Sequence, residues 1–153
     1  MHHLWVNGDY EISTDPARVD VGLVHGFLAN SYWAKGIPLE TVRRSVENSI
    51  CFGIYHGQQQ IGFARIISDL ATFAYLADVF MLQSYRGRKL SRWLMECIVR
   101  HPDLQGLRRW MLATRDVHGL YAKFGFTAVR SPETWMERHD PEVYTRKPAT
   151  GSP

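Results

Sequence analysis

The apolar positions of the chain change their spacing from segment to segment, and each spacing predicts an element. Between Leu90 and Arg100 the apolar residues share one side of a helix, while charged residues recur every four positions on the other side. Pro102 then ends this predicted helix. A second helical stripe runs from Val117 to Phe124, with Asp116 as a candidate N-cap and Gly125 as a terminator.

Strands are predicted where apolar and β-branched residues alternate or run together between turn residues. These segments are residues 5–12, 50–56, 60–68, 73–82 and 110–114, with two further short candidates at 126–129 and 134–137. The run 73–82 is apolar except for Asp78, which is typical of a central strand buried on both faces. We therefore expect the middle of the sheet there.

Two further helices are predicted between the first two strands. Val24, Phe27 and Leu28 keep helical spacing, and after a break at residues 36–38 another helical stripe follows around Val42. These helices should pair over one face of the sheet. The element order predicts an α+β fold in a single domain over residues 1–139, and the Pro-, Thr- and Lys-containing residues 140–153 are expected to form a flexible tail.

Composition is that of an ordinary globular domain. The chain has 153 residues, of which 45% are hydrophobic and 22% charged. No apolar stretch approaches the ~18 residues of a membrane span, so we expect a cytoplasmic protein with no membrane partner. Cys51 and Cys97 lie in apolar runs without metal-type or disulfide-type spacing and should be buried free thiols.

The net charge of +3 is small, but its distribution is informative. Arg86, Arg88, Lys89 and Arg92 lie within seven positions, between a predicted strand and a helix N-terminus. Unpaired N–H groups and the positive end of a helix dipole bind phosphate there. A pyrophosphate is therefore one candidate ligand, and a solvated basic turn is the alternative.

Two motifs carry a resemblance to a known family. Val79-Phe80-Met81 followed by Tyr85-Arg86-Gly87 resembles the strand and pyrophosphate loop of the GNAT superfamily of N-acetyltransferases, and residues 119–126 (GLYAKFGF) resemble that family's LYxxxGF stretch. The resemblance implies a mixed, mostly antiparallel central sheet of six to seven strands with helices on both faces. It also implies acetyl-CoA as the acyl donor.

The resemblance further implies which residues hold the cofactor. The pantetheine would pair with the backbone of Val79, Phe80 and Met81, and the pyrophosphate would lie on Arg86, Gly87, Arg88, Lys89, Leu90 and Ser91. Lys89 and Ser91 stand where many relatives have glycine, so their side chains either crowd the phosphates or add a cation and a hydroxyl donor. Thr114 stands where many relatives have a cofactor-binding Asn.

Tyr121 and Asp78 are the candidate catalytic residues. In the family a tyrosine at the position of Tyr121 protonates the leaving thiolate, and a phenol with a pKa of ~10 can do so at neutral pH. On its helical stripe it could instead be a core residue. Asp78 would accept the proton of the incoming amine, directly or through water, or orient it; the alternatives are a structural carboxylate and Tyr75 as the base.

The sequence thus predicts an N-acetyltransferase that acetylates a primary amine, on a small molecule or a peptide, by direct attack in a ternary complex. A non-catalytic acyl-CoA-binding module is the first alternative and a nucleic-acid-binding domain the second, although we expect no nucleic-acid partner. Tyr32, Trp33, Arg65 and Asp69 are candidate lining residues of an acceptor pocket, and His118 of the cofactor rim. No metal is expected, and a homodimer is a candidate assembly.

Overall fold

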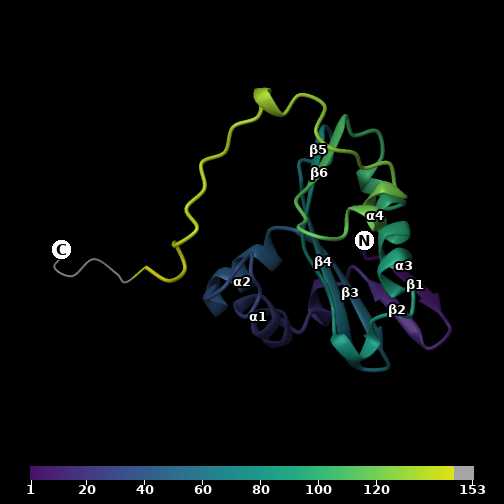
Figure 1. Cartoon of the computed structure of the whole chain (residues 1–153). Helices are drawn as coiled ribbons and strands as arrows, with labels where there is room; N and C mark the ends of the chain where they lie inside the picture. The colour runs from purple at the N-terminus through teal and green to yellow at the C-terminus, as the bar shows by residue number, and fades with distance from the viewer. Residues whose placement is uncertain (147–153) are drawn as a thin grey trace.

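The computed structural model describes residues 1–146, which form a six-stranded sheet with helices on both faces (Figure 1). The strands lie side by side in sequence order: β1 (Leu4–Asn7), β2 (Tyr10–Ser13), β3 (Ile50–His56), β4 (Gln59–Ser68), β5 (Phe73–Met81) and β6 (Arg109–Leu112). Neighbours from β1 to β5 are antiparallel, and β6 is parallel to β5. The expected α+β fold with a mostly antiparallel sheet is confirmed.

Two pairs of helices cover the sheet. Helices α1 (Val21–Ala29) and α2 (Leu39–Glu47) lie on one face, and α3 (Leu90–Val99) and α4 (His118–Ala122) lie on the other (Figure 1). The expected pairing of the first two helices over one face is therefore confirmed. Short 3-10 turns lie at Pro16–Arg18, Gln83–Tyr85, Pro102–Leu104 and Pro132–Thr134.

Each face of the sheet has its own apolar core. The α3 stripe packs on alternate residues of β2 to β5, including Ile12, Ile54 and Leu76. The α1–α2 pair packs on Phe63 and Phe80 of the other face. Because full burial of each large apolar side chain contributes about 1.5–3 kcal/mol, these two layers fix the sheet between the helices. Both cysteines are free and buried, as expected.

Three predictions, about the first strand, the middle of the sheet and the start of α4, differ from the structure. The first predicted strand is a hairpin, because Gly8 adopts φ 60° and turns the chain between β1 and β2. Strand β5 is not the middle strand: it lies next to the edge strand β6, and β3 and β4 occupy the centre. Asp116 is not the N-cap of α4; the helix begins after Val117, whose N–H lies 3.4 Å from the Thr114 hydroxyl.

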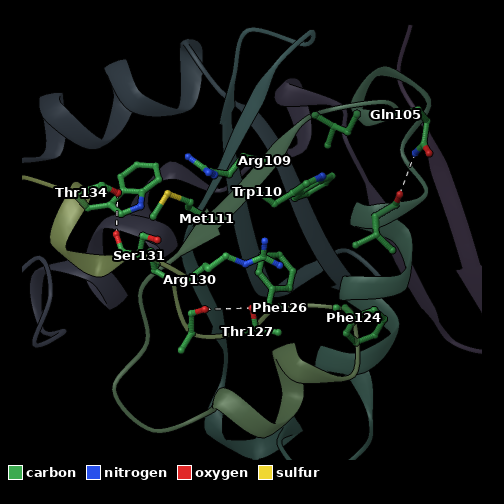
Figure 2. Close-up of a pocket in the computed structure, with 16 residues that line it drawn as sticks. Gln105, Arg109, Trp110, Met111, Phe124, Phe126, Thr127, Arg130, Ser131 and Thr134 are labelled. Atoms are coloured by element: carbon green, nitrogen blue, oxygen red, sulfur yellow. Dashed lines mark hydrogen bonds between the residues drawn. The ribbon is translucent and has the colours of Figure 1, made fainter.

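The two last predicted strands are wrong, since residues 126–129 and 134–137 pair with no strand in the part of the chain that the structure describes. Pro132 lacks an N–H, and the Ser131 carbonyl accepts hydrogen bonds from the Thr134 backbone and hydroxyl, so the chain turns instead of extending. A cavity of about 650 Å³ separates β6 from residues 124–135 (Figure 2).

We refer to residues 127–143 as the C-terminal arm. From the β6 end of the sheet it runs to the α1–α2 side, where Tyr144 packs on the second core (Figure 1). Asp140 and Arg146 then close a turn through two hydrogen bonds of 2.8 Å. Residues 147–153 of the expected flexible tail lie outside the described residues, and the domain boundary at 139 stays a prediction.

Candidate active site

A cleft opens where β5 and β6 separate. Their parallel pairing begins at Phe73 and Arg109 and ends at Leu76 and Leu112, yet β5 continues to Met81. Beyond Leu76, the edge of β5 that faces β6 has no strand partner among residues 1–146. A cleft of about 1230 Å³ occupies this region. It therefore presents open backbone hydrogen-bonding groups to an extended ligand.

A β-bulge in β5 lies at the cleft. Arg65 of β4 pairs with Ala77, and Phe63 pairs with Phe80, so the one intervening residue of β4 is opposite two residues of β5. Asp78, one of those two, has φ 56°, in the left-handed region that aspartate tolerates better than most residues.

The bulge decides which way Asp78 faces. Before it, Ala74 and Leu76 pack in the α3 core; after it, Val79 and Met81 do so. In a strand with unbroken alternation, a residue two positions after Leu76 would face the same apolar core. The extra residue instead leaves the Asp78 carboxylate on the α1–α2 face.

There, the Asp78 carboxylate accepts two hydrogen bonds, one on each oxygen. Trp33 Nε1, from the loop between α1 and α2, donates to Oδ1 at 2.9 Å, and Arg65 Nε donates to Oδ2 at 2.9 Å. Arg65 Nη1 also lies 3.2 Å from the Ser49 hydroxyl. The side chains of Asp78 and Arg65 are only 10% and 15% exposed. The Asp78 carboxylate thus links the sheet to the loop between α1 and α2 through hydrogen bonds.

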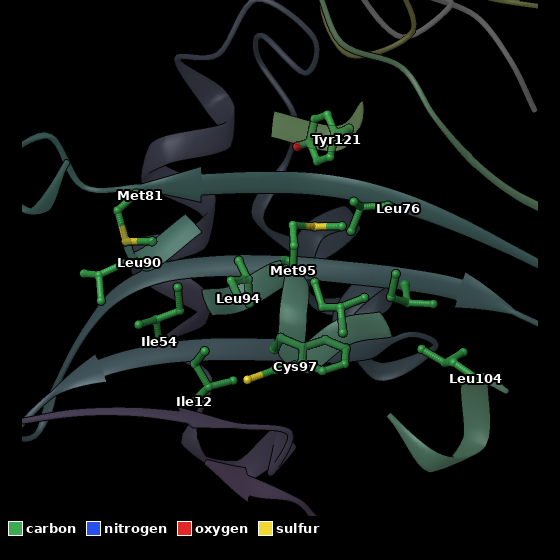
Figure 3. Close-up of a cluster of buried hydrophobic side chains, with 14 of the residues drawn as sticks. Ile12, Ile54, Leu76, Met81, Leu90, Leu94, Met95, Cys97, Leu104 and Tyr121 are labelled. Carbon is green, nitrogen blue, oxygen red and sulfur yellow. The ribbon is translucent and has the colours of Figure 1, made fainter. Parts of the chain in front are cut away.

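Tyr121 lies across the cleft on α4, at the edge of the α3 core beside β5 (Figure 3). The residue is 6% exposed, and its ring packs edge-on against Phe126. Burial raises the pKa of Tyr121 above its ordinary value, and nearby Tyr32 adds to the rise. The phenol therefore keeps its proton at neutral pH, and among the described residues it makes no side-chain hydrogen bond that would occupy that proton.

The predicted pyrophosphate loop connects β5 to α3 at one end of the cleft. Arg86 Nε donates to the Met81 carbonyl at 3.1 Å, and Arg88 donates to the Tyr10 hydroxyl at 2.9 Å. Gly87 has φ 80° and Lys89 φ 61°. Lys89 thus adopts the backbone conformation that glycine adopts freely, at a cost of about 1–2 kcal/mol.

The first turn of α3 has no side-chain cap. Its N-cap residue is Lys89, which makes no side-chain hydrogen bond to the helix. The N–H groups of Leu90 and Ser91 therefore have no partner within the helix, and the positive dipole end adds to the charges of the loop. This arrangement is suited to a phosphate group.

The other candidates are placed in two groups. Tyr32, Trp33, Arg65, Tyr75 and Thr114 line the cleft. Asp69 does not: its exposed carboxylate accepts hydrogen bonds from the backbone of residues 71–73 and from the Thr72 hydroxyl, which hold its pKa well below the usual range. His118 is also absent from the residues of the described chain, 1–146, that line the cleft.

Two parts of the cleft were not recognised from the sequence. The Arg115 guanidinium stacks 3.7 Å from the centre of the Tyr32 ring, so the two loops touch across the cleft. Residues 137–141 and 143–145 also line it, although they resemble a polar tail in the sequence. Their only sequence signal is the aromatic Tyr144 within that polar stretch.

Residues 1–146 contain no group of three or more His, Cys, Asp or Glu side chains that is arranged to hold a metal ion. No helix in this part of the chain has the length and apolar character needed to cross a bilayer.

Known proteins share both the sequence and the fold. A family model of the acetyltransferase (GNAT) domain matches residues 47–128. FG08082 of Gibberella zeae, whose name suggests an acetyltransferase, is 33% identical over 142 residues, covering 78% of this chain and 79% of that protein.

Among solved structures, a GNAT-family protein from Xanthomonas campestris pv. campestris, xcc2953, is 51% identical with a TM-score of 0.87, covering 90% of this chain and 97% of that one. A protein from Clostridium acetobutylicum, solved with acetyl-CoA, has a TM-score of 0.62 at 15% identity, covers 91% of this chain and 96% of that one, and shares the fold alone. The family model covers more than half of the chain, and the structure has the separated β5 and β6 strands and the basic loop. The chain therefore belongs to the GNAT family of acetyltransferases.

Proposed function

We propose that the protein transfers the acetyl group of acetyl-CoA to a primary amine in a ternary complex. The observation that carries the proposal is the cleft between β5 and β6, which has an uncapped, basic helix N-terminus at one end and a protonated phenol in its wall. Family membership supports acetyl transfer as the reaction class.

The cofactor would lie along the open edge of β5. Backbone groups of Val79, Phe80 and Met81 would pair with the pantetheine as with an added strand, and residues 86–91 would hold the pyrophosphate. The N–H groups of Leu90 and Ser91 are free for this role, and Lys89 already has the left-handed backbone conformation that glycine adopts freely. Thr114, which lines the cleft, would be a further contact.

The chemistry would require one proton donor. The neutral amine nitrogen attacks the thioester carbon, a backbone N–H of β5 stabilises the oxyanion, the nitrogen releases a proton to water, and the carbon–sulfur bond breaks. Tyr121 then gives its proton to the departing thiolate and is reprotonated by solvent. Burial raises the pKa of Tyr121, so the phenol carries its proton at neutral pH and that proton is available when the carbon–sulfur bond breaks.

Asp78 would hold the amine in place. Both of its oxygens already accept a hydrogen bond, from Trp33 and Arg65, which favours an orienting role over that of a free base. A carboxylate oxygen accepts more than one hydrogen bond, so the ammonium of the acceptor can still bind it. We propose that water takes up the proton that the ammonium loses before attack.

The experiment is an acetyl-CoA turnover assay over a panel of primary amines, read by release of free thiol, with Tyr121→Phe as the test variant. The variant keeps the ring that packs on Phe126. Turnover should fall by about 10²- to 10⁴-fold, the range for loss of a positioned acid. Wild-type turnover in this variant would contradict the assignment of Tyr121 as the acid. If the wild-type protein releases no thiol with any of the amines, a non-catalytic binding module would be favoured.

A further inference from the structure

One wall of the cleft is aromatic. Tyr32 and Trp33, both in the loop between α1 and α2, line the cleft and are 54% and 42% exposed. Their rings meet edge to face, with centroids 5.0 Å apart. An exposed pair of aromatic rings inside a cleft is typical of a surface that binds the apolar part of a ligand.

This aromatic wall lies against both candidate catalytic groups. The Trp33 indole N–H donates to Asp78 Oδ1 at 2.9 Å. Tyr32 lies close enough to Tyr121 to contribute to the raised pKa of that phenol. An acceptor with its amine at Asp78 therefore has the rest of its atoms against Trp33 and Tyr32.

A cation without an ion pair lies at the Tyr32 side of the wall. The Arg115 guanidinium stacks 3.7 Å from the centre of the Tyr32 ring, and Arg115 forms no ion pair within residues 1–146. Stacking uses only the face of a guanidinium, so the N–H groups at its edge remain available to a carboxylate. Arg115 thus presents a held cation to the acceptor side of the cleft.

The other charged side chains of the cleft differ from Arg115 in partner or position. Arg65 already donates to Asp78 and to Ser49. Among the cations that line the cleft in residues 1–146, Arg115 alone stacks on the aromatic wall. The remaining charged or titratable lining residues are Lys35, Asp116, Glu137, Arg138, His139 and Asp140.

We propose that the acceptor is an amino acid with an apolar skeleton: its ammonium binds Asp78, its carboxylate binds Arg115, and its apolar part lies on Tyr32 and Trp33. A carboxylate and a cation beside one aromatic surface complement the two charges and the apolar part of such a molecule. The inference rests on the function proposed above, because it names the acceptor class of that reaction.

Thiol release with matched pairs of acceptors tests the proposal. Phenylalanine is compared with phenylalaninamide, and para-(aminomethyl)benzoate with para-(aminomethyl)benzamide, which repeats the comparison at a longer spacing between the two groups. In one or both pairs, Arg115→Gln should lower the ratio of kcat/KM for the carboxylate to that for the amide at least about tenfold, the scale of one charge-assisted hydrogen bond. Because each protein is assayed on both members of a pair, the intrinsic reactivity of the two amines cancels.

Lys35→Gln is the matched control, since Lys35 also lines the cleft from the α1–α2 loop and undergoes the same charge change. Its ratio should stay within about twofold of the wild type, because an exposed charge outside the contact is screened. Arg115→Lys keeps the charge but not the planar group, so it should recover part of the ratio.

The outcomes separate this inference from the proposed function. If Arg115→Gln lowers kcat/KM equally for both members of each pair, Arg115 only holds the loop, and the inference is overturned while acetyl transfer stands. If Lys35→Gln changes the ratio as much as Arg115→Gln does, the assignment of the carboxylate to Arg115 is wrong. If the wild type releases no thiol with any amine, the proposed function and the inference both fail.

Discussion

Two neighbours hold the Asp78 carboxylate in position, and variants at this site distinguish its candidate roles as an orienting group or a general base. Arg65 and Trp33 each hold one oxygen. A carboxylate held in this way keeps a fixed orientation toward the cleft, and removal of one partner from a nearly buried ion pair costs several kcal/mol. Variants at this junction should therefore be chosen to keep the shape of the side chain.

Asp78→Asn should lower kcat/KM for the amine by about 10- to 100-fold, because the neutral amide no longer attracts an ammonium ion. Acetyl-CoA affinity, measured by calorimetry, should stay within about twofold of the wild type. If the carboxylate orients the amine, the acidic limb of the pH–rate profile should remain; a lost limb would identify Asp78 as the base. Wild-type kinetics at every pH would make it a structural residue.

Trp33→Phe is the matched test of the loop contact. The ring that packs near Phe27 and Tyr32 is kept, and only the N–H donor to Asp78 is lost. We expect a rise in KM for the amine of about three- to tenfold with kcat little changed, since one hydrogen bond to a charged group contributes about 1 kcal/mol or more. A fall in kcat with an unchanged KM would argue against a positioning role.

At the scale of elements, the loop before α3 combines charge with an open helix terminus. Arg86→Glu should weaken acetyl-CoA binding by about 1–3 kcal/mol, because a charge-assisted contact is replaced by repulsion. Arg44→Glu is the control with the same charge change, because Arg44 is an exposed residue of α2 that does not line the cleft. This variant should bind acetyl-CoA as the wild type does. Calorimetry at two salt concentrations should show weaker wild-type binding at high salt. Unchanged affinity in Arg86→Glu would place the pyrophosphate elsewhere.

Some elements could be predicted from the sequence because their signals are local. The α3 helix repeats its apolar side over ten residues, and the loop cations lie next to one another, so periodicity and spacing were sufficient. The two missing strands show the opposite case. Residues 126–129 and 134–137 have the composition of strands, but a strand exists only if a neighbour pairs with it, and no single sequence carries that information.

Two further features could not be predicted from the sequence: the bulge at Asp78, and the part of the cleft wall that residues 137–141 and 143–145 form. A bulge is one extra residue relative to the partner strand, so it becomes visible only when β4 and β5 are aligned in space. The polar stretch around Tyr144 gains its structure from a contact with the distant α1–α2 layer.

For the whole molecule, the buried thiols predict sensitivity to alkali. Burial raises the pKa of Cys51 and Cys97 from 9.0 to about 12. The folded chain therefore keeps these protons while the unfolded chain loses them, so the free energy of unfolding is unaffected below about pH 9 and falls as the pH rises toward 12. Tyr55, whose pKa burial raises from 10.0 to about 12, adds to the loss above pH 10.

Denaturant unfolding under reducing conditions from pH 8 to pH 11 checks this slope. Each thiol should account for about 1–2 kcal/mol of lost stability between pH 9 and pH 11. Cys97→Ala should be less stable at pH 8, since a buried side chain is truncated, but its stability should fall less steeply with pH. Equal slopes in the variant and the wild type would show that the thiol ionises as easily in the folded chain as in the unfolded one.

The bulge in β5 also has an evolutionary consequence, because it divides the strand into two halves that are out of phase. Ala74 and Leu76 face the α3 core before it, and Val79 and Met81 face that core after it. Loss of Ala77 alone would join the halves in regular alternation, leave every apolar side chain on its own face, and keep the carboxylate on the cleft side. We expect relatives with a shorter β5 to have their one-residue gap at this point.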